Sequence, residues 1–310
     1  MSKKLRIGGA SGFWGDSVIA TPQLLNGNDL DFIVYDYLAE ITMSIMARAR
    51  AKDATKGYAV DFVSSVLKLN LRQIADQNVK ILSNAGGVNP EACAEAIREL
   101  IKELKLDLKV SVVLGDDLMR EKNKFSELNT KEMYSNEDFP AEDKIASINA
   151  YLGAFPIAEA LKSGADIVIT GRSVDSAVTL GACIYSFGWN EKEYDKLAAG
   201  SLAGHIIECG TQSTGGNFTD WELVSKDLHQ IGYPIVEVSE DGSFDCTKSK
   251  NSTGMVSFGT VAEQMLYEIG DPQAYILPDV ICDFSNVKIE ETEKDKVKIS
   301  GAKGLSLIHI

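Results

Sequence analysis

Hydrophobic residues along this chain fall into short runs separated by stretches with helical spacing. Before about residue 200 the β-rich runs are Leu5–Gly8, Phe32–Tyr35, Val79–Ser83, Leu108–Leu114 and Asp166–Thr170. Between them, apolar residues recur every three or four positions, as in an amphipathic helix, most clearly from Pro90 to Lys105. This alternation favours an α/β fold of the Rossmann-like kind, with a mostly parallel sheet flanked by helices.

Two further features divide the chain. The stretch Glu121–Lys144 is polar and is interrupted by Pro140, so we expect a surface excursion that could act as a lid. After about residue 200 the alternation weakens, and strand character appears at Pro234–Val238, Val256–Val261 and Val287–Ser300. We therefore expect a Rossmann-like ligand-binding domain over residues 1–200 and a second, smaller α/β part over residues 201–310.

Composition narrows the class of partner. The chain has 45 acidic and 31 basic side chains and a formal net charge of −14, which repels nucleic-acid phosphates and anionic lipids. It has no signal-peptide pattern and no run near the roughly 18 apolar residues that cross a bilayer. Its five cysteines are scattered without a CxxC pair, which is typical of a reducing compartment. We expect a cytoplasmic protein that binds neither nucleic acid nor membranes, and a homo-oligomer stays open.

A glycine-rich loop follows the first predicted strand. Gly9, Gly12 and Gly15 have the GxxGxxG spacing of short-chain dehydrogenases, and Asp36 ends the next strand, where a ribose-binding acid would lie. This predicts NAD(P) binding as one alternative. Against it, Pro22 interrupts the expected crossover helix, and no tyrosine has a lysine four residues later. The other alternative is a tight turn that needs glycine for its backbone alone.

Two later loops suggest a site for an anion. The loop Ser83–Pro90 (SNAGGVNP) leads into the helix that begins at Pro90, so the backbone amides of the loop could bind a carboxylate or phosphate. A simple turn with Asn89 as the helix cap is the alternative. Arg172 follows another strand, and its guanidinium suits bidentate binding of an oxyanion. It could instead pair with Asp175 or Asp16.

Four side chains are candidates for acid–base chemistry. Asp36 and Glu40 stand four residues apart, and on one helical face they could transfer protons or hold a divalent cation. They could also merely complement a helix dipole. His205 and Glu208 stand three apart and could bind metal or transfer protons. No second histidine has metal-site spacing, so we expect no structural zinc, and the cofactor stays unknown.

Several segments together resemble the acyclic terpene utilisation protein A (AtuA) family. The segments are LRIGGASGFWGDS, DYLAEITMSIMARAR, NAGGVNP, NAYLGAFPIAEALKSGADIVITGRSVDSA and GHIIECGTQSTGGNF. The resemblance runs from Leu5 to about Gly304 and implies an intracellular protein encoded beside enzymes that degrade citronellol, geraniol and related branched acids as CoA thioesters. The positions that the segments single out are Gly12, Asp16, Ser17, Asp36, Glu40, Asn84, Gly86, Gly87, Asn89, Arg172, Asp175, His205, Glu208 and Gly216.

The resemblance also bears on the end of the chain. Members of that family continue further, whereas residues 305–310 follow abruptly. We therefore expect the second part to be truncated at the C-terminus, with exposed apolar surface between Val280 and Ile299.

The leading hypothesis is an enzyme, of lyase or hydratase type, that acts on a branched carboxylic acid or its CoA thioester. Arg172 with the loop from Asn84 to Asn89 would bind the anion, and Asp36, Glu40 or His205, beside Glu208, would be the acid or base. Amides of residues 9–17 would stabilise an enolate-like intermediate. The alternatives are an NAD(P)-dependent oxidoreductase and a non-catalytic subunit that binds an acyl-CoA or a partner enzyme.

Overall fold

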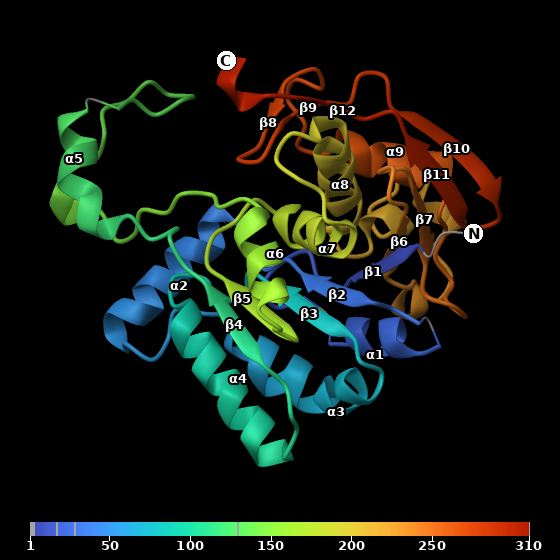
Figure 1. Cartoon of the computed structure of the whole chain (residues 1–310), viewed down its shortest axis with the longest axis horizontal. Coiled ribbons are helices and arrows are strands. Elements are labelled where there is room, and N and C mark those ends of the chain that lie inside the picture. The colour runs from blue at the N-terminus through green and yellow to red at the C-terminus, as the bar shows by residue number, and fades with distance from the viewer. Residues whose placement is uncertain (1–3, 17, 28, 129, 310) are drawn as a thin grey trace.

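The computed structural model describes residues 4–309 except 17, 28 and 129, and it has one large sheet between two layers of helices (Figure 1). The sheet has nine strands in the order β10-β11-β7-β6-β1-β2-β3-β5-β4. Its parallel strands are β1 (Leu5–Gly9), β2 (Phe32–Tyr35), β3 (Lys80–Ser83), β4 (Val110–Val113) and β5 (Ile167–Thr170). This confirms the α/β fold and the parallel sheet expected from the alternating pattern.

Successive strand residues point to opposite faces, and each face has its own core. Ile33 and Tyr35 pack under one helical layer, whereas Phe32 and Val34 pack under the other. The first layer contains α1 (Ala20–Leu25), α2 (Glu40–Lys52), α3 (Lys68–Asp76) and α4 (Pro90–Leu104). The second contains α6 (Phe155–Lys162), α7 (Ala177–Phe187) and α8 (Tyr194–Ile207). Pro22 lies in the first turn of α1, where a missing amide costs no helical hydrogen bond, so it does not prevent a crossover helix.

Strands after residue 200 extend the same sheet. β6 (Pro234–Val238) pairs antiparallel with β1 and is followed outward by β7, β11 and β10. The added strands are β7 (Phe244–Lys248), β10 (Lys288–Glu293) and β11 (Lys296–Ser300). A separate antiparallel sheet consists of β8 (Tyr275–Ile276), β9 (Ile281–Asp283) and β12 (Lys303–Leu305). The division into two parts at residue 200 stays a prediction. Pairing between β1 and β6 joins strands from both sides of this position in one sheet.

Two expectations for this later part need correction. The segment Val256–Val261 is not a strand, because Ser257 caps helix α9 (Phe258–Leu266). The Ser257 side chain accepts from the amide of Thr260, whose hydroxyl accepts from the amide of Ser257, which is a capping box. The apolar surface expected to be exposed between Val280 and Ile299 is covered, since Val280, Val297 and Ile299 are fully buried.

The polar stretch 121–144 is a surface excursion, as expected. It carries the short helix α5 (Lys122–Glu127), which stands away from the body of the fold in Figure 1. Among the described residues, no helix combines the length and apolar character needed to cross a bilayer.

Candidate active site

The site lies where the carboxyl ends of the parallel strands meet. Asp36 follows β2, Asn84 follows β3 and Arg172 follows β5, so all three come to one edge of the sheet. Glycines let the loops approach closely: a Cβ atom on Gly86 would overlap the carbonyl oxygen of Thr170. On the other side, a Cβ atom on Gly9 would overlap the Ile207 carbonyl, so the end of α8 rests directly on β1. The glycine loops that follow β1 and β3 therefore pack closely against neighbouring backbone at this edge of the sheet.

Asp36 is buried, with only 6% of its surface exposed. Its Oδ1 accepts hydrogen bonds from Nδ2 of Asn84 at 2.5 Å and from the amide of Leu38 at 3.2 Å. Asn84 is held in turn by the amide of Tyr37, which donates to Oδ1 of Asn84 at 2.8 Å. Burial raises the pKa of Asp36 well above its usual range, and the nearby carboxylates of Asp175 and Glu208 raise that pKa further. Burial and the neighbouring carboxylates thus favour the neutral form of the Asp36 carboxyl, against the opposing effects of Asn84 and Arg172.

His205 and Glu208 form a buried pair at the end of α8. Nδ1 of His205 lies 2.7 Å from Oε1 of Glu208, and the two side chains are 2% and 7% exposed. Burial raises the pKa of Glu208, and His205 opposes that rise. Burial alone would lower the pKa of His205, but the Glu208 carboxylate and the hydrogen bond to it leave that pKa raised. A raised pKa at both His205 and Glu208 is expected when the imidazole and the carboxylate share one proton.

Further contacts fix the imidazole. Nε2 of Gln264 donates to the backbone carbonyl of His205 at 2.7 Å, and the ring of Tyr275 lies 6.3 Å from the His205 ring, between centroids. Nε2 of His205 is buried and makes no hydrogen bond within the part of the chain that the structure describes. A buried imidazole nitrogen with no partner costs free energy, so this atom retains the capacity to bind a proton or a ligand.

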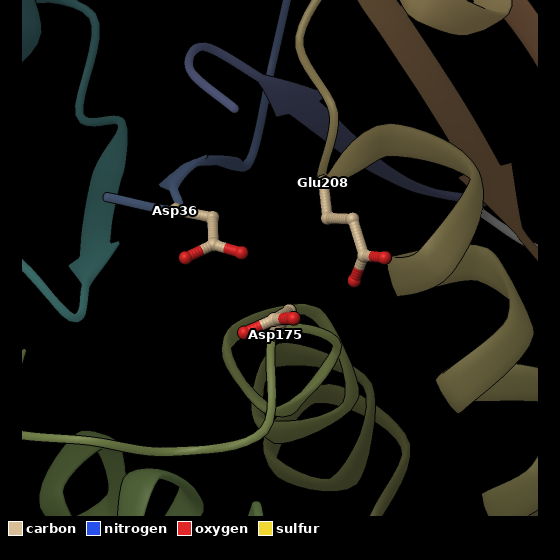
Figure 2. A group of neighbouring side chains, drawn as sticks. All are labelled: Asp36, Asp175 and Glu208. Atoms are coloured by element: carbon tan, nitrogen blue, oxygen red, sulfur yellow. The ribbon is translucent and has the colours of Figure 1, made fainter. Parts of the chain in front are cut away.

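Asp36, Asp175 and Glu208 turn their carboxyl groups toward one another from three separate elements (Figure 2). One carboxylate oxygen of each lies within 4.8 Å of the others. Like charges this close disfavour one another's ionised form, and at Asp36 the guanidinium of Arg172 offsets part of this effect. Among the described residues, this is the group with spacing to hold a metal ion, and oxygen ligands of this kind suit Mg²⁺ or Ca²⁺.

Arg172 lies beneath this cluster and uses only part of its guanidinium. Its Nη1 donates to Oδ1 of Asp175 at 2.6 Å and to the carbonyl of Ser173 at 3.0 Å. Its Nη2 comes no closer than 3.9 Å to Oε1 of Glu40, and its Nε is buried and makes no hydrogen bond to any residue that the structure describes. Of the two ion pairs considered for Arg172, the structure contains the one with Asp175. The Nε–Nη2 edge, which binds carboxylates bidentately, is not occupied by a carboxylate.

A groove of about 420 Å³ leads outward from Arg172. Apolar side chains on it come from Met43 of α2 and from the end of the excursion, at Phe139, Pro140, Ile145 and Ile148. At its inner end the ring of Tyr151 covers the guanidinium, with Cζ of Arg172 4.0 Å from the ring centroid. The hydroxyl of Tyr151 donates to Glu40, and this bond lowers the pKa of Glu40.

Glu40 therefore does not join Asp36. Its side chain is 82% exposed and lies at the mouth of the groove, whereas Asp36 is buried in the carboxyl cluster. The four-residue spacing places the two on different sides of Arg172, because Asp36 precedes α2 and only Glu40 belongs to the helix.

Other predicted residues are engaged in loop packing. Gly12 would place a Cβ atom 2.8 Å from the carbonyl carbon of Cys209, and its amide donates to Oδ2 of Asp16 at 3.0 Å. Gly87 has φ of +55°, and a Cβ atom there would overlap Sδ of Met46. Gly216 packs against Thr211. These contacts explain the glycines without a ligand, and NAD(P) binding stays a prediction.

Asn89 and Ser17 are the two remaining residues that the sequence predicts for the site. Asn89 does not cap α4 with its side chain, because its Nδ2 instead donates to the carbonyls of Ala54 and Lys56 at 2.9 and 2.8 Å. It thereby ties the end of α2 to the loop. Ser17 lies outside the described residues.

Sequence reasoning missed two aromatic residues of the site. Tyr151 and Tyr275 lie on segments without a strand-end or glycine signal, so neither periodicity nor spacing marks them. Their positions depend on how the excursion and the small sheet pack against the strand ends, which is a long-range property.

A protein-family model described as acyclic terpene utilisation family protein AtuA matches residues 5–307. No curated protein and no solved structure matches the chain. The matched residues include every side chain of the carboxyl cluster, the Arg172 groove and the buried pair.

Proposed function

Since the chain belongs to the acyclic terpene utilisation (AtuA) family, we propose that it is an enzyme of branched-chain carboxylic acid or acyl-CoA degradation, of lyase or hydratase type. The observation that carries the proposal is the placing of the buried carboxyl of Asp36 close to Glu208, which forms a buried pair with His205. An addition or elimination next to a carbonyl needs one group that gives a proton and another that removes one.

The surroundings divide these roles. Asp36, whose pKa is raised, takes the role of the acid, and its Oδ1 already accepts two hydrogen bonds, which leaves Oδ2 to carry the proton. Glu208 with His205 is the base, because the imidazole can hold the proton that the pair removes. Groups whose environments separate their protonation states in this way are typical of acid–base sites.

Arg172 is the group that would bind the substrate carbonyl or carboxylate. Its open Nε–Nη2 edge offers two parallel hydrogen bonds, and the apolar groove beyond it has room for a branched chain. The amide of Gly12 already donates to Asp16, so we assign stabilisation of an enolate-like oxygen to Arg172 before the loop of residues 9–17.

The reaction then follows from these positions. Glu208 removes the proton on the carbon next to the carbonyl, Arg172 stabilises the negative charge on the carbonyl oxygen, and Asp36 protonates the departing hydroxyl, which leaves as water. Hydration is the same sequence in reverse. Tyr151 must move aside for the substrate to reach the guanidinium, because its ring covers Arg172.

Exchange of carbon-bound hydrogen tests the proposal without knowledge of the exact leaving group. A panel of branched saturated, unsaturated and 3-hydroxy acyl-CoA thioesters is incubated with the protein in D₂O, and mass spectrometry follows deuterium uptake and conversion. We expect uptake or turnover with at least one thioester and its loss in Asp36→Asn and Glu208→Gln.

Glu99→Gln, an exposed change on α4, is the matched control and should behave as the unmodified protein. If Asp36→Asn and Glu208→Gln kept the activity of the unmodified protein, the assignment of acid and base would be overturned. Binding of a thioester with no exchange in any member of the panel would favour the non-catalytic alternative.

A further inference from the structure

The two edges of the nine-stranded sheet differ in chemistry. The outer strand on one side, β10, has the sequence KIEETE, and its pairing with β11 shifts register between Glu291 and Glu293. Charged side chains and irregular pairing are the features with which proteins prevent an edge strand from pairing with another chain. This edge is therefore protected.

The opposite edge strand, β4, lacks that protection. Its sequence is VSVV, without a charged residue, and it runs into Leu114, which is 56% exposed. The amide of Ile167 in β5 donates to the carbonyl of Lys109, so by strand alternation the backbone groups of Val110 and Val112 point away from β5. Nη2 of Arg98 reaches the Val110 carbonyl from outside at 3.3 Å, in agreement with this direction.

The edge of β4 lies along a groove of about 880 Å³ between α4 and α6. Glu91, Glu95 and Arg98 of α4 form one wall, and α6 forms the other with Pro156, Glu159 and Ala160. Figure 1 shows α4 running beside β4 at this border of the sheet. An unpaired strand with half-buried valines and an open groove beside it is a surface suited to another strand.

We propose that β4 pairs antiparallel with β4 of a second copy of this chain, which joins the two sheets across a two-fold axis. Such an axis, perpendicular to the sheet, keeps each helical layer on its own side, so the two α4 helices would lie antiparallel to each other. One stripe of α4, at helical spacing, carries Glu91 and Glu95 in the first half of the helix and Arg98 and Lys102 in the second. Glu91, Glu95 and Arg98 of this stripe line the groove, whereas the exposed Glu99 and Glu103 lie on the adjacent stripe.

This charge order identifies the occupant. Antiparallel α4 helices would place the acidic half of one copy against the basic half of the other, twice over, which is the self-complementarity that a two-fold interface requires. Two copies of net charge −14 repel each other, so a dimer needs local attraction of this kind at its interface. The Arg98 side chain is 45% exposed and also pairs with Glu95 of its own helix at 3.3 Å, so its contact with the Val110 carbonyl can give way to a strand.

Sedimentation velocity over a range of concentrations tests the pairing. We expect the unmodified protein to reach twice its 33.6 kDa mass, and Val112→Pro and Val112→Lys to remain at 33.6 kDa. Proline at 112 removes an outward amide without loss of a bond to β5, so the monomer should keep its circular dichroism spectrum and its melting temperature to within a few degrees. Thr292→Lys places the same charge on the protected edge and should leave the dimer intact.

A charge exchange on α4 gives the second arm. Glu95→Arg and Arg98→Glu should each raise the dissociation constant about tenfold or more, and the double variant should recover most of that loss. Hydrogen exchange at the Val112 amide should slow as the concentration of the unmodified protein rises. A monomer at every concentration, a dimer that survives both Val112 changes, or a double variant no better than the singles would each overturn the proposal.

Discussion

Nδ1 of His205 lies 2.7 Å from Oε1 of Glu208, in a pocket where both side chains are almost fully buried. The pair occurs at the end of α8, three residues apart, and Glu208 turns its carboxyl toward those of Asp36 and Asp175 (Figure 2). A carboxylate beside a buried imidazole favours the charged form of the imidazole, whereas burial opposes it. The protonation state of His205 therefore depends on Glu208, and the dependence can be measured.

Glu208→Gln should lower the pKa of His205. The Glu208 carboxylate is the main group that raises this pKa against the opposite effect of burial, so its removal leaves only the smaller effects of Gln264 and Asp175 against burial, and the pKa of His205 should fall. NMR titration of the imidazole signals checks this, with His229→Gln to assign the resonance. A pKa of His205 that stays raised in Glu208→Gln would mean that another group holds the charge.

Asp36→Asn should change how stability depends on pH. The folded pKa of Asp36 is raised, so the unfolded chain releases this proton first as pH rises above about 4. The unmodified protein then loses stability up to the folded pKa, by as much as about 1.4 kcal/mol per pH unit. The neutral asparagine escapes this loss.

Thermal melts between pH 4 and pH 8 measure the effect. The melting temperature of Asp36→Asn relative to the unmodified protein should rise with pH, whereas exposed Asp107→Asn should follow the unmodified protein. A constant difference between Asp36→Asn and the unmodified protein would show that Asp36 ionises normally in the fold.

Arg172→Lys should weaken ligand binding more than folding. Lysine keeps a charge for Asp175 but loses the Nε–Nη2 edge, so affinity for a branched enoyl-CoA should fall by about 1–3 kcal/mol. Calorimetric titration of the thioester beside melts of the same variant separates the two effects. An unchanged affinity with a melting temperature several degrees lower would assign Arg172 to the ion pair with Asp175 alone.

Tyr151→Ala should speed the association of the same thioester, because the ring that covers Arg172 is gone. Tyr151→Phe keeps the ring and loses only the hydrogen bond to Glu40, so its association rate should stay unchanged while the pKa of Glu40 rises. Stopped-flow measurements of binding distinguish the two variants. Equal association rates for Tyr151→Ala and Tyr151→Phe would show that the Tyr151 ring does not limit access of the thioester to Arg172.

The sequence was sufficient to locate the strand ends. Buried runs of four or five residues, each followed by Asp36, Asn84 or Arg172, predict side chains at one edge of a parallel sheet, because crossover connections bring those ends together. It was not sufficient for the partners of these side chains. Tyr151 reaches Arg172 only after the excursion of residues 121–144 returns to the sheet, and no local pattern encodes that contact.

Local chemistry also outweighed composition in one segment. The run Val256–Val261 is rich in β-branched residues, yet Ser257 and Thr260 supply both halves of a helix cap, and the helix forms. In the same way, the glycine fingerprint at residues 9–15 predicts a ligand loop, whereas the position of α8 against β1 already requires glycine at position 9.

Gly9→Ala should destabilise the fold and disturb the site. The added methyl group would overlap the Ile207 carbonyl, so α8 must shift, and with it Glu208 and His205. Overpacking of this kind costs about 1–3 kcal/mol, which urea denaturation can resolve. Gly270→Ala is the matched control, because no atom lies within 4 Å of its added methyl group and its backbone is not left-handed. The altered position of Glu208 should also lower the pKa of His205, by lengthening their contact. If Gly9→Ala has the same stability in urea as Gly270→Ala but loses thioester binding, glycine is needed at position 9 for ligand binding and not for the approach of α8 to β1.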